Sequence, residues 1–352
     1  MQPRGPSPTG AAVGVLETAI AARIFPAAVA EVGHSRGVLW REHLGTLAFD
    51  GAASTDDATV FDLASLTKPI ATTTVVLRLA ERGTLALDET VSACFSDWRG
   101  PDRERVTVRD LLEHASGLAA RLVDRPPTTR REFEHEICVM TLEAKPRTRS
   151  IYSDLGFILL GFIAESRGGA GLNVLFAEAM GGRRDLGFLP AGVDGVAPTV
   201  PLPDDSRRGR RLAGEVHDNY AAALGGVAGH SGLFGNCSAV GRFARFMLAA
   251  AQGRIVSDMP LTPSSLSRAV ARSTVPGSSR ALGWDTMMPT SSCGTRMSAA
   301  AFGHVGFTGT SLWIDPTRDR YYVLLTNRVA GGGTVDQMRD VRRAFHDALA
   351  DL

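Results

Sequence analysis

Short, mostly apolar runs separated by polar turns lie near both ends of the chain, and other segments carry apolar residues at helical spacing. Residues 27–32 and 37–49 are predicted strands, joined by a polar turn at residues 33–36. Residues 310–315 and 321–326 predict a second hairpin. Strands at both ends of the chain predict one sheet to which both ends contribute.

Helices are predicted before, between and after these strands. Apolar residues recur at intervals of three and four in the segments 11–24, 70–80, 106–118, 155–166 and 335–349. We therefore predict an α/β fold, in which an antiparallel sheet built from both chain ends is flanked by helices and a mostly helical subdomain is inserted. The predicted boundaries are 1–90 plus 273–352 for the α/β subdomain and 91–272 for the helical subdomain.

The composition is that of a folded protein with almost no net charge. The 352 residues include 38 basic and 37 acidic ones, for a net charge of +1, and 44% are hydrophobic. These values exclude an intrinsically disordered chain and a polybasic nucleic-acid binder. Of the 38 basic residues, 36 are arginine and only Lys68 and Lys145 are lysine. Because lysine can lose its proton near neutral pH and arginine cannot, a lysine kept for chemistry stands out in this chain.

Cysteine spacing and the N-terminal residues bear on the cellular compartment. The four cysteines are scattered, without a C-x-x-C pair or a nearby histidine at metal-ligand spacing, so we expect free thiols. The first 25 residues lack the long apolar core of a signal peptide, and the apolar stretch 156–164 is too short to span a bilayer. We expect a cytoplasmic protein, or a periplasmic or extracellular one if a leader has been removed.

The clearest candidate for chemistry is Ser65, which precedes Lys68 by three residues at the start of a predicted helix. At this spacing the hydroxyl and the amine share one helix face, where the amine can activate the serine if its own pKa allows. The chance that a serine stands three residues before either of the two lysines is about one in seven, so this spacing identifies a catalytic pair only together with further motifs. The alternative is that Ser65 only caps the helix and Lys68 is solvated. The apolar run that follows Lys68 argues against that alternative.

Two further motifs follow in a fixed order. Tyr152-Ser153-Asp154 opens the apolar helix LGFILLGFIAE, and His304-Val305-Gly306-Phe307 precedes a predicted strand. The three motifs in this order resemble the serine β-lactamase and penicillin-binding-protein superfamily, and most closely its class C, esterase and D-aminopeptidase branch. The resemblance extends through FDLASLTK, LLEHASGL, YSDLGFILLG, GEVHDNYAAALGGVAGHSGLFG and GHVGFTGTSLWIDP, so it covers nearly the whole chain.

The resemblance implies a role for each matched position and a single catalytic unit over residues 1–352. Ser65 would be the acylated nucleophile, and Lys68 and Tyr152 would share the proton transfers. The backbone N–H groups of Ser65 and Phe307 would form the oxyanion hole. Gly306 would leave room for substrate along the strand edge.

Two positions depart from the family pattern. His304 replaces a lysine that helps β-lactamases to bind the carboxylate of the drug, and a histidine is mostly neutral at pH 7. Asp154 replaces an asparagine and brings a second anion near Lys68. Both changes leave acyl transfer possible and weaken the case for efficient β-lactam hydrolysis. We predict an esterase-like serine hydrolase of carboxylic esters or small amides. The alternatives are a class C-type β-lactamase, a D-alanyl carboxypeptidase or aminopeptidase, and a catalytically silent binding protein with the same cleft.

Other candidates are weaker. His114 lies in a segment that the family uses to anchor a helix. A triad built from His217-Asp218 and His230-Ser231 lacks the G-x-S-x-G elbow. The arginines at 207, 208, 210 and 211 follow Asp204 and Asp205 and precede Glu215, which predicts a solvated loop, or one that binds a substrate carboxylate. Trp284 and Trp313 are predicted core residues.

We expect no metal, no cofactor and no nucleic-acid partner, only a small ester, amide or β-lactam-like substrate. The sequence makes no prediction of oligomeric state.

Overall fold

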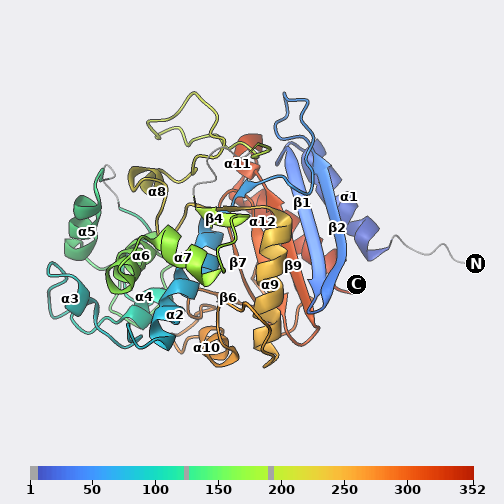
Figure 1. The fold of residues 1–352 in the computed structure, drawn as a ribbon. Coiled ribbons are helices and arrows are strands. Elements are labelled where there is room, and N and C mark those ends of the chain that lie inside the picture. The colour runs from blue at the N-terminus through green and yellow to red at the C-terminus, as the bar shows by residue number, and fades with distance from the viewer. Residues whose placement is uncertain (1–6, 123–126, 189–193) are drawn as a thin grey trace, which may run out of the picture.

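The two ends of the chain pair in one antiparallel sheet (Figure 1). The structure is a computed structural model that describes residues 7–122, 127–188 and 194–352. The sheet has the order β2-β1-β9-β8-β7-β6. Its strands are β1 Ala27–His34, β2 Gly37–Gly45, β6 Asp285–Thr286, β7 Phe302–Val305, β8 Ser311–Asp315 and β9 Arg320–Thr326. Pairing of β1 with β9, from Ala28 opposite Thr326 to Gly33 opposite Tyr321, joins the two predicted hairpins and confirms the predicted sheet.

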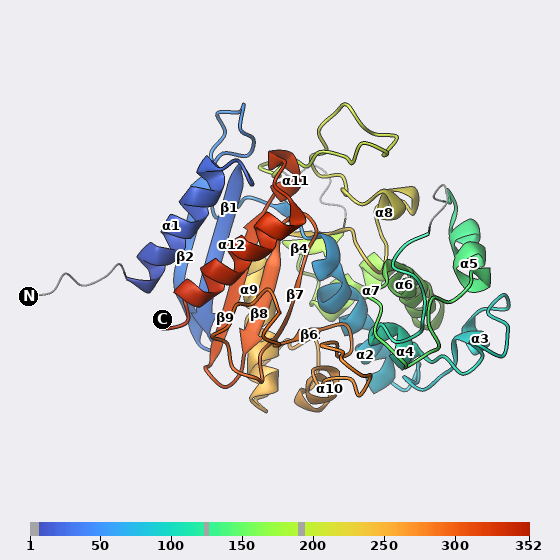
Figure 2. The ribbon, with the colours of Figure 1, turned by 180° about the vertical axis from the view of Figure 1, so that it is seen from behind.

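Helices cover both faces of this sheet because its central strands are apolar on both sides. On β1, Ala28, Ala30 and Val32 point toward one apolar cluster, whereas Ala27 and Val29 point toward another. The first cluster lies under α1 Pro8–Ala21 and α12 Val335–Ala348, which lie side by side (Figure 2). Helix α9 Cys237–Ala251 covers the opposite face. The predicted core positions Trp284 and Trp313 are fully buried, which confirms that prediction.

The remaining chain forms helices and a small sheet beside the large one (Figure 1). Its helical elements are the 3-10 turn η1 Ala64–Leu66, the π-helix η2 Lys68–Thr73, α2 Thr74–Glu81, α3 Val91–Cys94, α4 Val108–Leu112, α5 Arg130–Val139, α6 Asp154–Gly168, α7 Leu172–Ala179, α8 Asn219–Ala223, α10 Pro263–Ala269 and α11 Arg328–Gly331. The small sheet has the order β3-β5-β4 and contains β3 Phe61–Asp62, β5 Leu233–Gly235 and β4 Leu186–Phe188.

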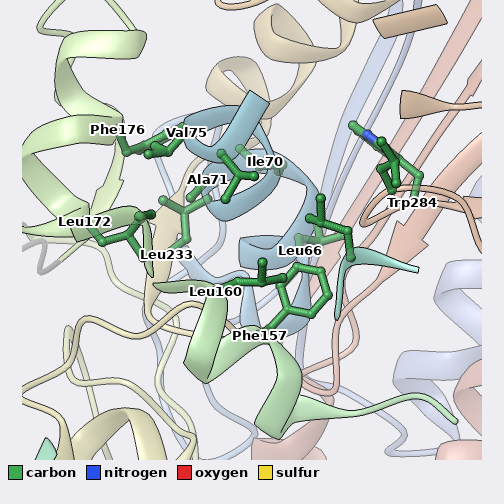
Figure 3. Packing of buried hydrophobic residues seen from close by; sticks show 14 of the residues in the cluster. Leu66, Ile70, Ala71, Val75, Phe157, Leu160, Leu172, Phe176, Leu233 and Trp284 are labelled. Carbon is green, nitrogen blue, oxygen red and sulfur yellow. The ribbon is translucent and has the colours of Figure 1, made fainter. Parts of the chain in front are cut away.

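The helical run from η1 to α2 is buried among other helices, as its β-branched sequence requires. Leu66, Ile70 and Val75 project from it into the main apolar cluster. Figure 3 shows these side chains against Phe157 of α6 and Phe176 of α7. Tertiary packing therefore holds a segment whose isolated helix propensity is low.

Two predicted elements were too long. The helix predicted over 106–118 is only α4 Val108–Leu112, because His114 (φ 56°) and Gly117 (φ 85°) adopt left-handed backbone conformations that end a helix. The strand predicted over 37–49 ends at Gly45, which also has a positive φ of 81°. The helices predicted at 11–24 and 155–166 are present as α1 and α6, each capped by a serine side chain.

The division into two subdomains stays a prediction. Residues 1–6 of the predicted α/β subdomain, and 123–126 and 189–193 of the predicted helical subdomain, lie outside the described residues. Helix α9 falls within the predicted helical range and packs on β1, β8 and β9. Among the described residues, no single helix has the length and apolar character to cross a membrane, although α6 and α7 meet that test together as a pair bent by 74°.

Candidate active site

Ser65 lies in the sharp turn η1, which leads into the buried helices η2 and α2. Asp62 accepts hydrogen bonds from the Ala64 N–H (2.8 Å) and the His217 N–H (2.7 Å). Ala64 has a φ of 47°, a left-handed conformation that L-residues rarely adopt. The turn directs Ser65 into a cavity of about 780 Å³, which Tyr152, Asp154, His304, Gly306 and Phe307 also line. The three sequence motifs therefore meet around one cavity.

Lys68 is completely buried beneath Ser65. Its Nζ donates to Ser65 Oγ at 3.1 Å and to Asp154 Oδ1 at 2.7 Å, with the His230 carbonyl oxygen at 3.3 Å. Burial opposes the charge on Lys68, but attraction by Asp154 and Tyr152 outweighs it and raises the pKa of Lys68 above its usual value. Lys68 is therefore an ammonium ion at neutral pH. The alternative of a solvated Lys68 is wrong.

Tyr152 lies over this ammonium group, with Lys68 Nζ 4.7 Å from its ring centroid. His114 packs on the other side, with ring centroids 4.7 Å apart. The Nδ1 atom of His114 accepts a hydrogen bond from the Ser153 N–H at 3.0 Å. Because Ser153 caps α6, His114 helps to anchor the start of this helix, as the family resemblance implied. Burial holds the pKa of His114 well below its usual value, and a neutral ring supports Tyr152 without adding charge.

Five residues form a closed chain of contacts at the cavity wall, which we call the ion-pair ring: Lys68, Asp154, Arg121, Asp218 and His230. Arg121 Nη1 bridges Asp154 Oδ2 at 2.9 Å and Asp218 Oδ2 at 2.8 Å. His230 Nε2 contacts Asp218 Oδ1 at 2.7 Å. The His230 carbonyl then returns to Lys68 Nζ.

Cationic neighbours in the ion-pair ring keep its two partly buried acids ionised. Burial disfavours the charge on Asp218, but His230 and Arg121 hold its pKa well below the usual range. The pKa of Asp154 is likewise lowered, because the pull of Lys68 exceeds the effect of burial. Asp154, Asp218 and His230 place possible ligand atoms within 4.8 Å of one another, as a metal site would. Lys68 and Arg121 already neutralise these oxygens, so we derive no metal chemistry from them.

The backbone N–H groups of two residues that line the cavity have no acceptor in the described part of the chain. Neither Ser65 nor Phe307 donates a backbone hydrogen bond to any residue that the structure describes. Thr308 Oγ1 and Thr310 Oγ1 donate to the Asp62 and Leu63 carbonyls, at 2.7 and 3.0 Å, and so tie the two segments together. Two free donors near the Ser65 hydroxyl would suit an oxyanion hole, the role that the family resemblance implies for them.

Gly306 is required where the end of β7 approaches the segment that leads to Ser65. A Cβ atom at this position would lie 2.5 Å from the Leu63 carbonyl oxygen. The close approach explains the glycine, and it brings the Phe307 N–H to the Ser65 side of the cavity.

His304 is buried and neutral. Its Nδ1 lies 2.9 Å from the Val305 carbonyl oxygen, and burial followed by repulsion from Arg280 holds its pKa well below the usual value. The position of the family's lysine therefore carries no charge here. Arg280 lies nearby, with its guanidinium carbon 4.8 Å from the Tyr152 ring centroid. Its guanidinium has no ion pair within the described part of the chain.

The sequence reasoning missed several arginines of the cavity, namely Arg121, Arg280, Arg328 and Arg342. In a chain with 36 arginines, no local sequence pattern marks Arg121 or Arg280 as a cavity residue. Arg342 is marked by such a pattern, because its spacing from Met338 and Phe345 places it on the apolar face of the last helix.

The other weighed residues have ordinary roles. Ser231 Oγ is buried without a partner among the described residues, so His230 and Asp218 form no triad with it. In the arginine loop, Arg207 pairs with Asp205 at 2.7 Å, and Arg210 pairs with Glu215 at 2.8 Å. All four cysteines are free thiols, as expected.

Comparisons with known proteins agree with this geometry. A family model described as Beta-lactamase matches residues 14–346. The chain is 30% identical over 309 residues to the "N-acetylmuramyl-L-alanine amidase" of Bacillus subtilis strain 168, covering 77% of this chain and 68% of that protein. It is 29% identical over 329 residues to the "Putative D-alanyl-D-alanine carboxypeptidase" of Escherichia coli strain K12, covering 82% and 73% of the two chains.

Solved structures share the fold over almost the full length. The structure of EstCE1, described as a hydrolase with promiscuous acyltransferase activity, has a TM-score of 0.77 at 19% identity, covering 97% of this chain and 98% of EstCE1. A penicillin-binding protein homologue from Caulobacter crescentus has a TM-score of 0.73 at 21% identity, covering 98% of each chain. The chain therefore belongs to the Beta-lactamase family, within the hydrolase superfamily of serine β-lactamases and penicillin-binding proteins.

Proposed function

We propose that the protein is a serine hydrolase that forms an acyl-enzyme on Ser65. The observation that carries this proposal is the 3.1 Å contact from Lys68 Nζ to Ser65 Oγ at the cavity. The two free N–H groups beside it would stabilise the charge that develops on the substrate oxygen.

The positive charge on Lys68 determines which residue accepts the Ser65 proton and which one stabilises negative charge. An ammonium ion cannot accept the Ser65 proton, so the proposed acceptor is the phenolate form of Tyr152, and Lys68 stabilises the negative charge on both oxygens. Ser65 Oγ bonds to the substrate carbonyl carbon, the tetrahedral intermediate collapses, and the leaving group departs with the proton from Tyr152. Water then attacks the acyl-enzyme by the same route and releases the acid.

Carboxylic esters and small amides are the proposed substrates. The neutral His304 lacks the cation that would hold a β-lactam carboxylate, which disfavours efficient β-lactamase activity. A D-alanyl peptidase is the second candidate, because Arg280 offers an unpaired cation at the cavity. The names of the amidase and carboxypeptidase relatives also support an amide substrate.

Turnover measurements rank these substrates. We expect wild-type protein to hydrolyse p-nitrophenyl acetate faster than nitrocefin or a D-Ala-D-Ala peptide, and Ser65→Ala to lose all but a residual rate. Full activity in Ser65→Ala would contradict the assignment of the nucleophile. No turnover of any substrate by wild-type protein would favour the catalytically silent binding protein.

A further inference from the structure

Two arginines from the C-terminal part of the chain bind the backbone beside the proposed oxyanion hole. They reach residues 306–310, the turn between β7 and β8, which we call the 306–310 turn. Arg342 of α12 donates through Nη2 to the Gly306 carbonyl at 2.7 Å and the Thr310 carbonyl at 2.9 Å. Arg328 donates through Nε to the Phe307 carbonyl at 3.1 Å.

Neither arginine has an acidic partner within the described residues. Arg342 is 5% exposed and Arg328 is 6% exposed, and both side chains line the cavity. Burial, together with repulsion from Arg328, lowers the pKa of Arg342 to about 9, so it keeps its charge at neutral pH. Burying a cation without an opposite charge is costly, and the fold alone does not call for it. An anion that forms only during the reaction would supply the opposite charge and would explain why a cation is buried here.

The hydrogen bond from Arg342 also sets the direction of one peptide group. No described peptide bond is cis, and in a trans peptide the C=O and N–H groups point in opposite directions. Because Arg342 holds the Gly306 carbonyl, the N–H of Phe307 in the same peptide group points away from Arg342. That N–H is the free donor of the proposed oxyanion hole.

We propose that Arg342 is a positioning residue for the oxyanion hole, with Arg328 in support. This inference rests on the proposed function. Arg342 fixes the Gly306–Phe307 peptide group for donation to the substrate oxygen. Its charge polarises that peptide group, which strengthens the Phe307 N–H as a donor when the oxygen becomes negative.

Three variants test this role with p-nitrophenyl acetate, a neutral ester. Arg342→Met removes the charge and the hydrogen bonds, and we expect kcat to fall by about tenfold to a hundredfold while KM changes by less than about threefold. Arg342→Lys keeps the charge and one donor group, and we expect it to recover most of the lost kcat. Arg343→Met is the matched control, because Arg343 also lies on α12 and binds two carbonyls, of Pro289 and Ser291, away from the cavity. It should keep the wild-type kcat.

Other outcomes would overturn the proposal. A wild-type kcat in folded Arg342→Met would do so, and so would a kcat loss of the same size in Arg343→Met. An effect confined to the KM of an anionic ester would make Arg342 a ligand for a substrate carboxylate instead. If Arg342→Met does not fold, Arg342→Gln replaces it with the same expected split between kcat and KM. Turnover that is insensitive to Ser65→Ala would instead contradict the proposed function itself, whatever the Arg342 variants do.

Discussion

Lys68 contacts Ser65 on one side and Asp154 on the other, and the acid determines its charge. The usual argument for a lysine base requires a lowered pKa, whereas the pKa of Lys68 is raised. An asparagine in place of Asp154, as in the family pattern, would bring no such negative charge. In the proposed mechanism, the exchange of this single residue therefore moves the role of proton acceptor from Lys68 to Tyr152.

Substitution of Lys68 by arginine tests how closely this site is fitted. Arginine keeps the charge but has a larger, planar head group, which the fully buried site does not accommodate in the same contacts with Ser65 and Asp154. We expect kcat/KM for p-nitrophenyl acetate to fall by about a hundredfold or more. Lys145→Arg is the control, since Lys145 is exposed and should tolerate the change. Near-wild-type activity in Lys68→Arg would contradict the role of Lys68.

At the scale of elements, the ion-pair ring links segments that are far apart in sequence. Lys68 lies in η2, Asp154 begins α6, and Asp218 caps α8 by accepting from the Ala221 N–H. His230 adds the segment that leads into β5. Ionised acids in the ion-pair ring therefore hold several short elements around the cavity.

Asp218→Asn keeps the helix cap and removes the charge from the ion-pair ring. We expect the free energy of unfolding at pH 7 to fall by about 2 kcal/mol, because Arg121 and His230 lose a partner that is partly buried and therefore partly screened by solvent. The pKa of Asp218 is lower in the folded protein than in the unfolded chain, so its stabilisation is present above about pH 4 and is lost as the pH falls further. The difference between variant and wild type should therefore narrow below about pH 4, as measured by urea denaturation from pH 7 to pH 3.

The control for this prediction is an exposed acid. Asp88 is 81% exposed at its side chain and pairs with Arg109 at 3.0 Å. Asp88→Asn should cost less than about 1 kcal/mol at any pH in this range. Equal losses in the two variants would contradict a special contribution of the ion-pair ring.

The sequence predicted the elements whose signals are local. Short apolar runs beside polar turns identified β1, β8 and β9, and apolar residues at helical spacing identified α6 and α12. The helix at 106–118 was predicted too long because a left-handed histidine at position 114 has no sequence signal. The ion-pair ring was not predictable from the sequence either, because Arg121 meets its partners only after folding.

At the scale of the whole molecule, the pairing of both chain ends assembles the site. The cavity takes Ser65 from the N-terminal part, Tyr152 from the middle and Phe307 from the C-terminal sheet. Sequence order and motif identity predicted this convergence through a family resemblance. The distances and charges that distinguish Lys68 as an ammonium ion required the structure.

The most direct test of the central claim is the mass of a trapped covalent intermediate. Wild-type protein treated with a fluorophosphonate probe should gain the mass of one phosphonyl group, and peptide mapping should place that group on Ser65. Ser65→Ala should gain none under the same conditions. A folded wild-type protein that stays unmodified, or a modification that persists in Ser65→Ala, would contradict Ser65 as the nucleophile.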